Sequence, residues 1–278
     1  AAWPPAHVEA LRAGLRSGHA EASEAAPDAD ASIFEGLAPI LDCEEYRSAL
    51  LTGLIVSAGG ITEHIAKPAK RALLRYLRQP AASSEKEPAG AAAGSSLPEE
   101  VHAARVTAVS AEMLKLYDTV PTKDSDPEAR RLVVSVLNVS ALLISHSCVP
   151  EVHAAPLLEC ITAKVKSTKD VGRLRAAVTV LVGLVSWPGA VRRRAVGILL
   201  YLLGFTFPVV RQFAAQALYV RLLEEQGDFD LRADDEGSIV AQDTLGEVTE
   251  VLCTTPWSSN NEESLASTLR EIYSKFGL

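Results

Sequence analysis

The chain has 278 residues, of which 48% are hydrophobic and only 5% aromatic, and its formal net charge is −8. This length permits a large aliphatic core. The negative charge argues against nucleic acid and anionic membranes as main ligands, because both are bound by positively charged faces. The most apolar run, residues 195–210, contains Gly204 and Pro208. It falls short of the roughly 20 residues of a membrane-spanning helix, so we expect it to be core.

The cysteines and the first residue of the chain give two further expectations, one about the cellular compartment and one about the length of the whole protein. The cysteines lack the paired spacing of secreted disulfide scaffolds, which predicts a reducing, cytoplasmic compartment. The chain begins at Ala1 without Met, so we expect it to be a piece of a longer protein. The cysteines are Cys43, Cys148, Cys160 and Cys253.

Helical periodicity recurs along almost the whole chain. Residues 1–42 are expected to hold a short helix and a linker, and residues 43–278 a HEAT-like helical array. Near residues 79–97, Pro, Gly and Ser accumulate and a disordered loop is expected. The expected helices cover residues 5–17, 44–57, 62–78, 97–116, 126–145, 150–165, 170–185, 188–205, 208–225, 244–252 and 259–276.

Local signals indicate where these helices begin and end. Asp126-Pro127-Glu128 places a cap, a proline and an acid at one helix start. Ser259 with Glu262 is interpreted as a capping box that opens the last helix. Gly59-Gly60 is expected to end the first long helix. The expected buried face of that helix consists of Tyr46, Ala49, Leu50, Gly53 and Leu54.

Two neighbouring stretches, 188–195 and 207–215, share a proline followed by Val-Arg-x-x-Ala and a long aliphatic helix. Proline is tolerated in a first helical turn, where its missing N–H has no partner. Repeated units of this kind predict an all-α fold, an α-solenoid of about five HEAT- or armadillo-like helical hairpins. No strand pattern competes. The second helices of the pairs are expected to start near Thr62, Asp126, Asp170, Pro208 and Ser259.

Four groups of residues are informative through their order and spacing. The first is Tyr46-Arg47, Gly53-Leu54, Val56-Ser57, Gly59-Gly60 and Thr62-Glu63; the second is Lys169-Asp170, Leu174, Pro188-Gly189 and Val191-Arg192-Arg193; the third is Phe207-Pro208, Val210-Arg211 and Ala215; the fourth is Glu247-Val248, Val251-Leu252, Thr255 and Trp257. In this order they resemble the C-terminal region of the tubulin-folding cofactor D family, over residues 46–257 without the loop at 79–97.

That resemblance implies a HEAT-repeat chaperone scaffold for tubulin folding, located in the cytoplasm and associated with the cytoskeleton. Proteins of the family capture β-tubulin and act with tubulin cofactors C and E and an Arf-like small GTPase. The assembly makes and dismantles αβ-tubulin dimers, and tubulin itself hydrolyses the GTP. The alternative is an unrelated HEAT-repeat binding scaffold of the transport or phosphatase type.

Four arginines are the candidates for partner binding, because a guanidinium makes paired hydrogen bonds to carboxylates and the resemblance implies an acidic tubulin surface. For Arg211 the favoured interpretation is structural, an ion pair with an acid of a neighbouring repeat. For residues 192–194, partner contact and a solvated or structural role both stay open. Three cations in a first helical turn oppose the helix dipole, so an acidic neighbour, a partner or solvent must compensate. The candidates are Arg192, Arg193, Arg194 and Arg211.

Two further charged groups are interpreted as solvated faces rather than as binding sites. One is the acidic loop at residues 228–236. The other is a basic face of the helix at 62–78. Its members are Lys67, Lys70, Arg71, Arg75 and Arg78.

Metal and catalytic chemistry are not expected. His146, Cys148, His153 and Cys160 are zinc-ligand types, but their spacing matches no familiar finger, so they are interpreted as ordinary buried or edge residues. The sequence contains no phosphate loop and no familiar nucleophile or metalloprotease motif. We therefore expect no cofactor and no enzymatic activity.

Overall fold

A computed structural model of the chain describes residues 34, 36–37, 40–78, 99–120, 127–166, 168–225, 227, 229–232 and 239–278. The chain divides into two compact units, residues 1–119 and 120–278. The helix expected at 5–17, the linker that follows it and the loop near 79–97 lie outside the described residues. The division between residues 1–42 and 43–278 that is expected from the sequence stays a prediction, since residues 1–33 lie outside the described part.

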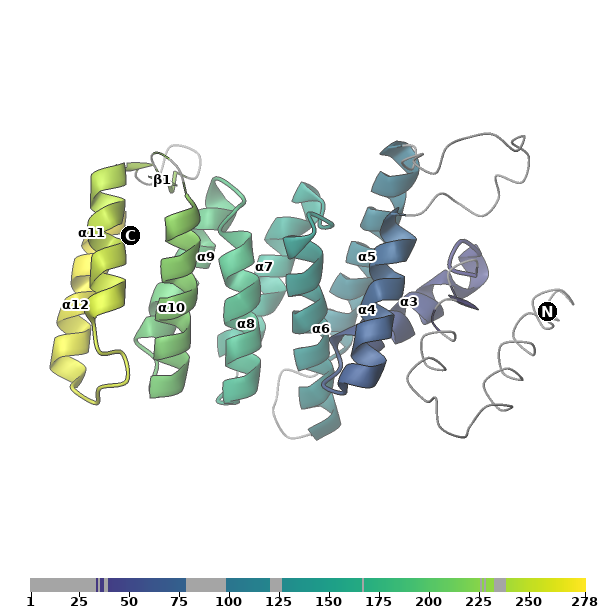
Figure 1. Cartoon of the computed structure of the whole chain (residues 1–278), viewed down its shortest axis with the longest axis horizontal. Helices are drawn as coiled ribbons and strands as arrows, with labels where there is room; N and C mark the ends of the chain where they lie inside the picture. The colour runs from purple at the N-terminus through teal and green to yellow at the C-terminus, as the bar shows by residue number, and fades with distance from the viewer. Residues whose placement is uncertain are drawn as a thin grey trace, which may run out of the picture. The chain divides into compact units, whose positions relative to one another are not determined.

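The first unit contains three described helices that pack on one another (Figure 1). They are α3 (Glu44–Gly59), α4 (Glu63–Arg78) and α5 (Glu99–Thr119). Helix α3 contacts both α4 and α5, and these two also contact each other. The core between them is aliphatic, with Ile55, Leu73, Leu77 and Met113 fully buried.

The buried face of α3 differs from the one expected. Of the five residues predicted to form it, only Leu54 is buried; the buried residues are instead Leu51, Leu54, Ile55, Ala58 and Gly59. Aliphatic residues surround most of this helix, so the sequence allowed more than one apolar face, and the packing of α4 and α5 selects the one that contains Leu51, Leu54 and Ile55. Helix α3 does end at Gly59, but Gly60 is extended (φ −60°) rather than left-handed.

Polar side chains tie α5 to its neighbours. The Glu112 carboxylate accepts hydrogen bonds from Ser48 Oγ (2.9 Å) and Thr52 Oγ1 (3.0 Å) on α3, and from Lys115 Nζ (3.1 Å) on its own helix. The buried Arg105 guanidinium donates to both oxygens of Asp42 (2.9 and 2.8 Å) and to the carbonyl of Tyr76 (2.8 Å). The three helices are therefore joined by specific polar contacts as well as by apolar packing.

The second unit consists of seven described helices and a two-stranded ribbon. Helices α6 (Pro127–Ser145), α8 (Val171–Leu184), α10 (Pro208–Glu224) and α11 (Gln242–Thr254) pack consecutively in one row (Figure 1). Helix α7 (Glu151–Lys166) and helix α12 (Glu262–Phe276) both pack on α9 (Ala190–Leu203), which forms a second row with them. Helices that follow one another in the chain also pack together, as α7–α8, α8–α9, α9–α10 and α11–α12 do. The expected all-α fold of stacked helical hairpins is confirmed.

The last hairpin departs from the expected alternation. The helix that continues the row of α6, α8 and α10 is α11, not the helix that begins after Ser259. Between α10 and α11 lies an antiparallel ribbon of β1 (Phe229–Asp230) and β2 (Ile239–Val240), which the sequence analysis did not predict. A strand of two residues carries too little alternation to be recognised in a sequence.

Several helix boundaries follow the expected signals, but α9 begins at Ala190, so Pro188 precedes the helix instead of lying in its first turn. Asp170 caps α8, its carboxylate accepting from the backbone N–H of Arg173 at 2.8 Å. Helix α12 is capped by Asn261 instead of Ser259, because the Asn261 side chain accepts from the N–H of Ser264.

The apolar run at 195–210 supplies core, as expected, with Leu199, Leu200 and Leu203 fully buried. Among the described helices, none combines the length and apolar character that crossing a membrane would require.

A close approach of α6 and α8 gives the first prediction. A Cβ atom on Gly183 would lie 2.6 Å from Cγ2 of Ile144, whereas one on Gly197 of α9 would meet nothing within 4 Å. Gly183→Ala should therefore lower the free energy of unfolding by about 1–3 kcal/mol, since a β-branched side chain cannot swing away. The matched Gly197→Ala should raise it by about 0.5–1 kcal/mol. Urea denaturation of both variants measures this, and equal effects would contradict it.

The acid dependence of stability gives the second prediction. Burial raises the pKa of Glu112, but the hydrogen bonds from Ser48, Lys115 and Thr52 outweigh it, and the pKa is lowered overall. Its contribution to stability is therefore present above the unfolded value of about 4.3 and is lost as pH falls through the folded pKa.

Urea denaturation between pH 7 and pH 3 should accordingly show wild type and Glu112→Gln converging at low pH. Glu250→Gln, at an exposed position of α11, serves as the control and should track wild type throughout. A difference between wild type and Glu112→Gln that stays constant over this range would refute the assignment.

Candidate functional site

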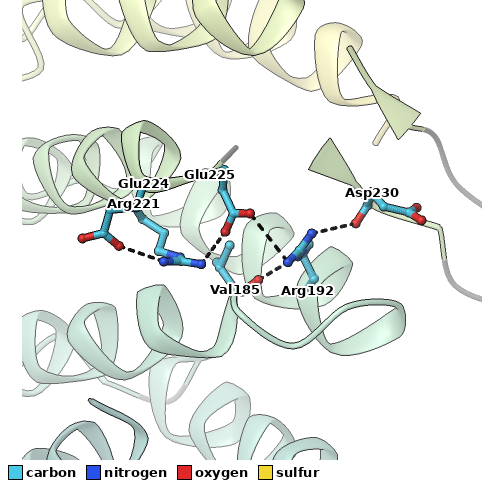
Figure 2. A network of polar contacts seen from close by, with 6 residues as sticks. All are labelled: Val185, Arg192, Arg221, Glu224, Glu225 and Asp230. Atoms are coloured by element: carbon cyan, nitrogen blue, oxygen red, sulfur yellow. Dashed lines mark hydrogen bonds and ion pairs between the residues drawn. The ribbon is translucent and has the colours of Figure 1, made fainter. Parts of the chain in front are cut away.

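Arg192 lies in the first turn of α9 and is occupied by contacts within the fold (Figure 2). Its Nε donates to the carbonyl of Val185 at 2.7 Å, and its Nη1 reaches the carbonyl of Asp230 at 3.5 Å. The guanidinium also lies 4.8 Å from the centre of the Phe229 ring, within the range of a cation–π contact. Arg192 thus fastens the start of α9 to the end of α8 and to β1.

An acidic side chain from α10 completes this network. Glu225 lies 3.8 Å from Nη2 of Arg192 and also pairs with Arg221, which bonds Glu224 at 2.7 Å (Figure 2). One carboxylate therefore serves two arginines. Only 12% of the Arg192 side chain is exposed, so its guanidinium is held mainly by contacts with the end of α8, β1 and Glu225.

Arg194 and Arg193 occupy more open positions in the same turn. Arg194 is exposed and forms an ion pair with Glu159 of α7. The hydrogen bond from Arg194 lowers the pKa of Glu159. An exposed pair of this kind contributes little to stability. Arg193 is half-buried. Acidic neighbours thus compensate at least two of the three cations that oppose the α9 dipole.

Arg211 is buried, with 5% of the residue exposed. Its guanidinium donates to the carbonyls of Phe205 (2.8 Å), Thr206 (3.2 Å), Trp257 (2.9 Å) and Ser259 (2.6 Å). The structural role favoured from the sequence assumed an acidic partner in a neighbouring repeat, but Arg211 donates to main-chain oxygens of two loops. Arg211 joins the α9–α10 loop to the α11–α12 loop and is not available at the surface.

The remaining polar candidates are dispersed. Within the described ranges there is no group of three or more His, Cys, Asp or Glu side chains placed to hold a metal ion. Cys148 is buried, and its thiol lies 3.3 Å from the carbonyl of His146. Most of the acidic loop lies outside the described residues. Hydrogen bonds from Arg232 hold the pKa of Asp230 down to about 2, which occupies that carboxylate within the ribbon.

Two hollows in the second unit were missed by sequence reasoning. One, of about 420 Å³, is lined by Arg211, Leu265 and Leu269 between the α9–α10 loop and α12. The other, of about 430 Å³, lies between α10 and α11 and is lined by Tyr219 and Trp257. No sequence signal could have found them, because each is built by residues about 50 positions apart that only the packing of α10, α11 and α12 brings together.

The Arg211 contacts give the third prediction. Arg211→Ala leaves several loop carbonyls without their donor and should lower the free energy of unfolding by about 2–4 kcal/mol. Arg211→Lys should recover less than half of this, because one ammonium cannot span carbonyls on two loops. The control is Arg131→Ala, at an exposed position of α6, which should change stability by less than about 0.5 kcal/mol. Full rescue by lysine in chemical denaturation would contradict the proposed role.

Comparison with known proteins adds the family context. The sequence model of the family described as tubulin folding cofactor D C terminal matches residues 6–173. This range contains the first of the four residue groups and the beginning of the second, and it also includes residues 98–145, which carry none of them. No solved structure matches the chain. Because the match covers well over half of the sequence, the chain belongs to the tubulin folding cofactor D C-terminal family.

Proposed function

We propose that this chain is a docking scaffold of a tubulin-folding chaperone and helps to bind β-tubulin and partner cofactors during assembly and disassembly of αβ-tubulin dimers. The observation that carries this proposal is the family match over residues 6–173. The proposed partners are β-tubulin, tubulin cofactors C and E and an Arf-like small GTPase. The proposed location is the cytoplasm, in association with the cytoskeleton.

The geometry agrees with a binding role. Stacked hairpins share an aliphatic interior and expose helix faces and loops, which is how helical repeat proteins bind other proteins. The buried polar side chains already considered serve as ties between helices, as Arg192, Arg211 and Glu112 do. We propose accordingly that the chain is not an enzyme and needs no cofactor. The family match argues against the alternative of an unrelated transport or phosphatase scaffold.

Of the four arginine candidates, Arg193 and Arg194 remain as partner-binding residues. Arg192 and Arg211 are committed to junctions within the second unit. Arg194 presents its guanidinium at the surface, where its weak pairing with Glu159 can be exchanged for a partner carboxylate.

The fourth prediction concerns this pair. Arg193→Glu combined with Arg194→Glu should weaken capture of β-tubulin or of the small GTPase by about tenfold, by opposing acidic groups on the partner, while helicity stays unchanged. The matched control is Arg131→Glu with Arg270→Glu, two exposed positions on α6 and α12, which changes net charge equally.

A pull-down of the chain against tubulin, each cofactor and the GTPase tests the function, and circular dichroism checks the fold. Capture of none of them by the wild-type chain would overturn the proposed function. Equal binding by wild type and the arginine variant would show that Arg193 and Arg194 are solvated and do not contact the partner.

A further inference from the structure

The outer face of α4 carries a concentration of positive charge in a chain whose net charge is −8. Lys67, Lys70 and Arg71 lie on one side of the helix at spacings of three and four residues. Lys67 and Arg71 are exposed and Lys70 is half-buried. Arg75 and Arg78 extend the same basic side toward the end of the helix.

The opposite side of α4 is buried in the core of the first unit. Its buried residues are Ala66, Ala69, Ala72, Leu73, Tyr76 and Leu77, and the helix packs on α3 and α5. The basic face is therefore presented outward by a helix that is anchored from behind. Pre-organised charge of this kind binds a partner without an ordering cost in the helix itself.

Within the described part of the chain, no ion pair joins Lys67, Lys70 or Arg71 to an acidic side chain, whereas several exposed cations of the second unit are paired. Arg194, Arg221, Arg232 and Lys275 each form an ion pair with Asp or Glu in the second unit. On α4 the only acidic residue is Glu63, in the first turn, and no ion pair joins it to Lys67 in the structure. These three cations are thus not neutralised by an ion pair with any residue that the structure describes.

We propose that the basic face of α4, defined by Lys67, Lys70 and Arg71, docks an extended acidic segment of a partner protein. Charge complementarity selects the occupant, since adjacent cations on a ridge match successive carboxylates of a flexible chain. An anionic membrane fits less well, because basic helices that lie on lipid insert their apolar face, and the apolar face of α4 is buried in the unit. The inference rests on charge and goes beyond the proposed function, since it does not require the partner to be tubulin.

The experiment uses a fluorescently labelled peptide of ten glutamates and the full chain, with binding followed by anisotropy at low and moderate salt. The α4 variant carries Lys67→Gln, Lys70→Gln and Arg71→Gln, three changes that keep helix propensity nearly constant. The matched control carries Arg131→Gln, Lys166→Gln and Arg270→Gln, exposed positions of the second unit, and changes net charge by the same amount.

We expect the α4 variant to bind the peptide about tenfold more weakly than wild type and the control to stay within about twofold, because three close charge contacts are lost. Wild-type affinity should fall as salt rises. Equal weakening in both variants would show that net charge alone acts and would overturn the proposal. Tighter α4-dependent binding to phosphatidylserine vesicles than to the peptide would overturn it in favour of a membrane.

Failure of this inference and failure of the proposed function give different results. A wild-type chain that captures tubulin but not the glutamate peptide refutes the role of α4 and leaves the proposed function standing. A chain that binds the peptide through α4 but captures no tubulin, cofactor or GTPase supports the role of α4 and refutes the proposed function.

Discussion

Guanidinium groups that bind main-chain carbonyls at the beginnings of helices hold the turns of both units. Arg47, the fourth residue of α3, donates to the carbonyls of Leu41 and Asp42 at 3.1 and 3.0 Å. Arg211, the fourth residue of α10, donates to the carbonyls of Phe205 and Thr206, which precede it by the same numbers of residues. Buried carbonyls in a turn have no helical partner and are costly to leave without a donor. The turns that precede α3 and α10 therefore depend on these arginines.

The same contacts show a structural use of the Val-Arg-x-x-Ala pattern, whose arginines the sequence analysis considered for partner binding. An arginine at a helix start is well suited to bind a partner carboxylate, and nothing in a linear sequence distinguishes that use from a structural one. In the folded units the valine before each arginine packs inward or at the edge of the core, while the guanidinium turns back to the preceding loop. The pattern is thus a signature of the hairpin turn, and the partner contact that we propose falls to the neighbouring Arg193 and Arg194.

Some exposed cations are held in ion pairs, and others form none with the residues that the structure describes. In the second unit, ion pairs within and between helices neutralise several of the exposed cations, as Lys275 with Glu247 and Arg194 with Glu159 show. In the first unit, the tie between Arg105 and Asp42 is internal, while Lys67 and Arg71 face outward. In a chain of net charge −8, α4 thereby presents a locally positive face, and the acidic partner that we propose would be attracted to it despite the overall repulsion.

The sequence determined the helical class, the order of the long helices and most of their boundaries, because helix caps, prolines and apolar periodicity are local signals; Asp170 and Pro208 mark helix starts in both views. Only the tertiary structure decided which face of α3 is buried and that α11 rather than α12 continues the row of α10. It also decided that Arg211 is buried and that Arg192 bonds the end of α8. Each of these depends on contacts between residues distant along the chain. The spacing of residues within one segment carries no information about which neighbour will cover it.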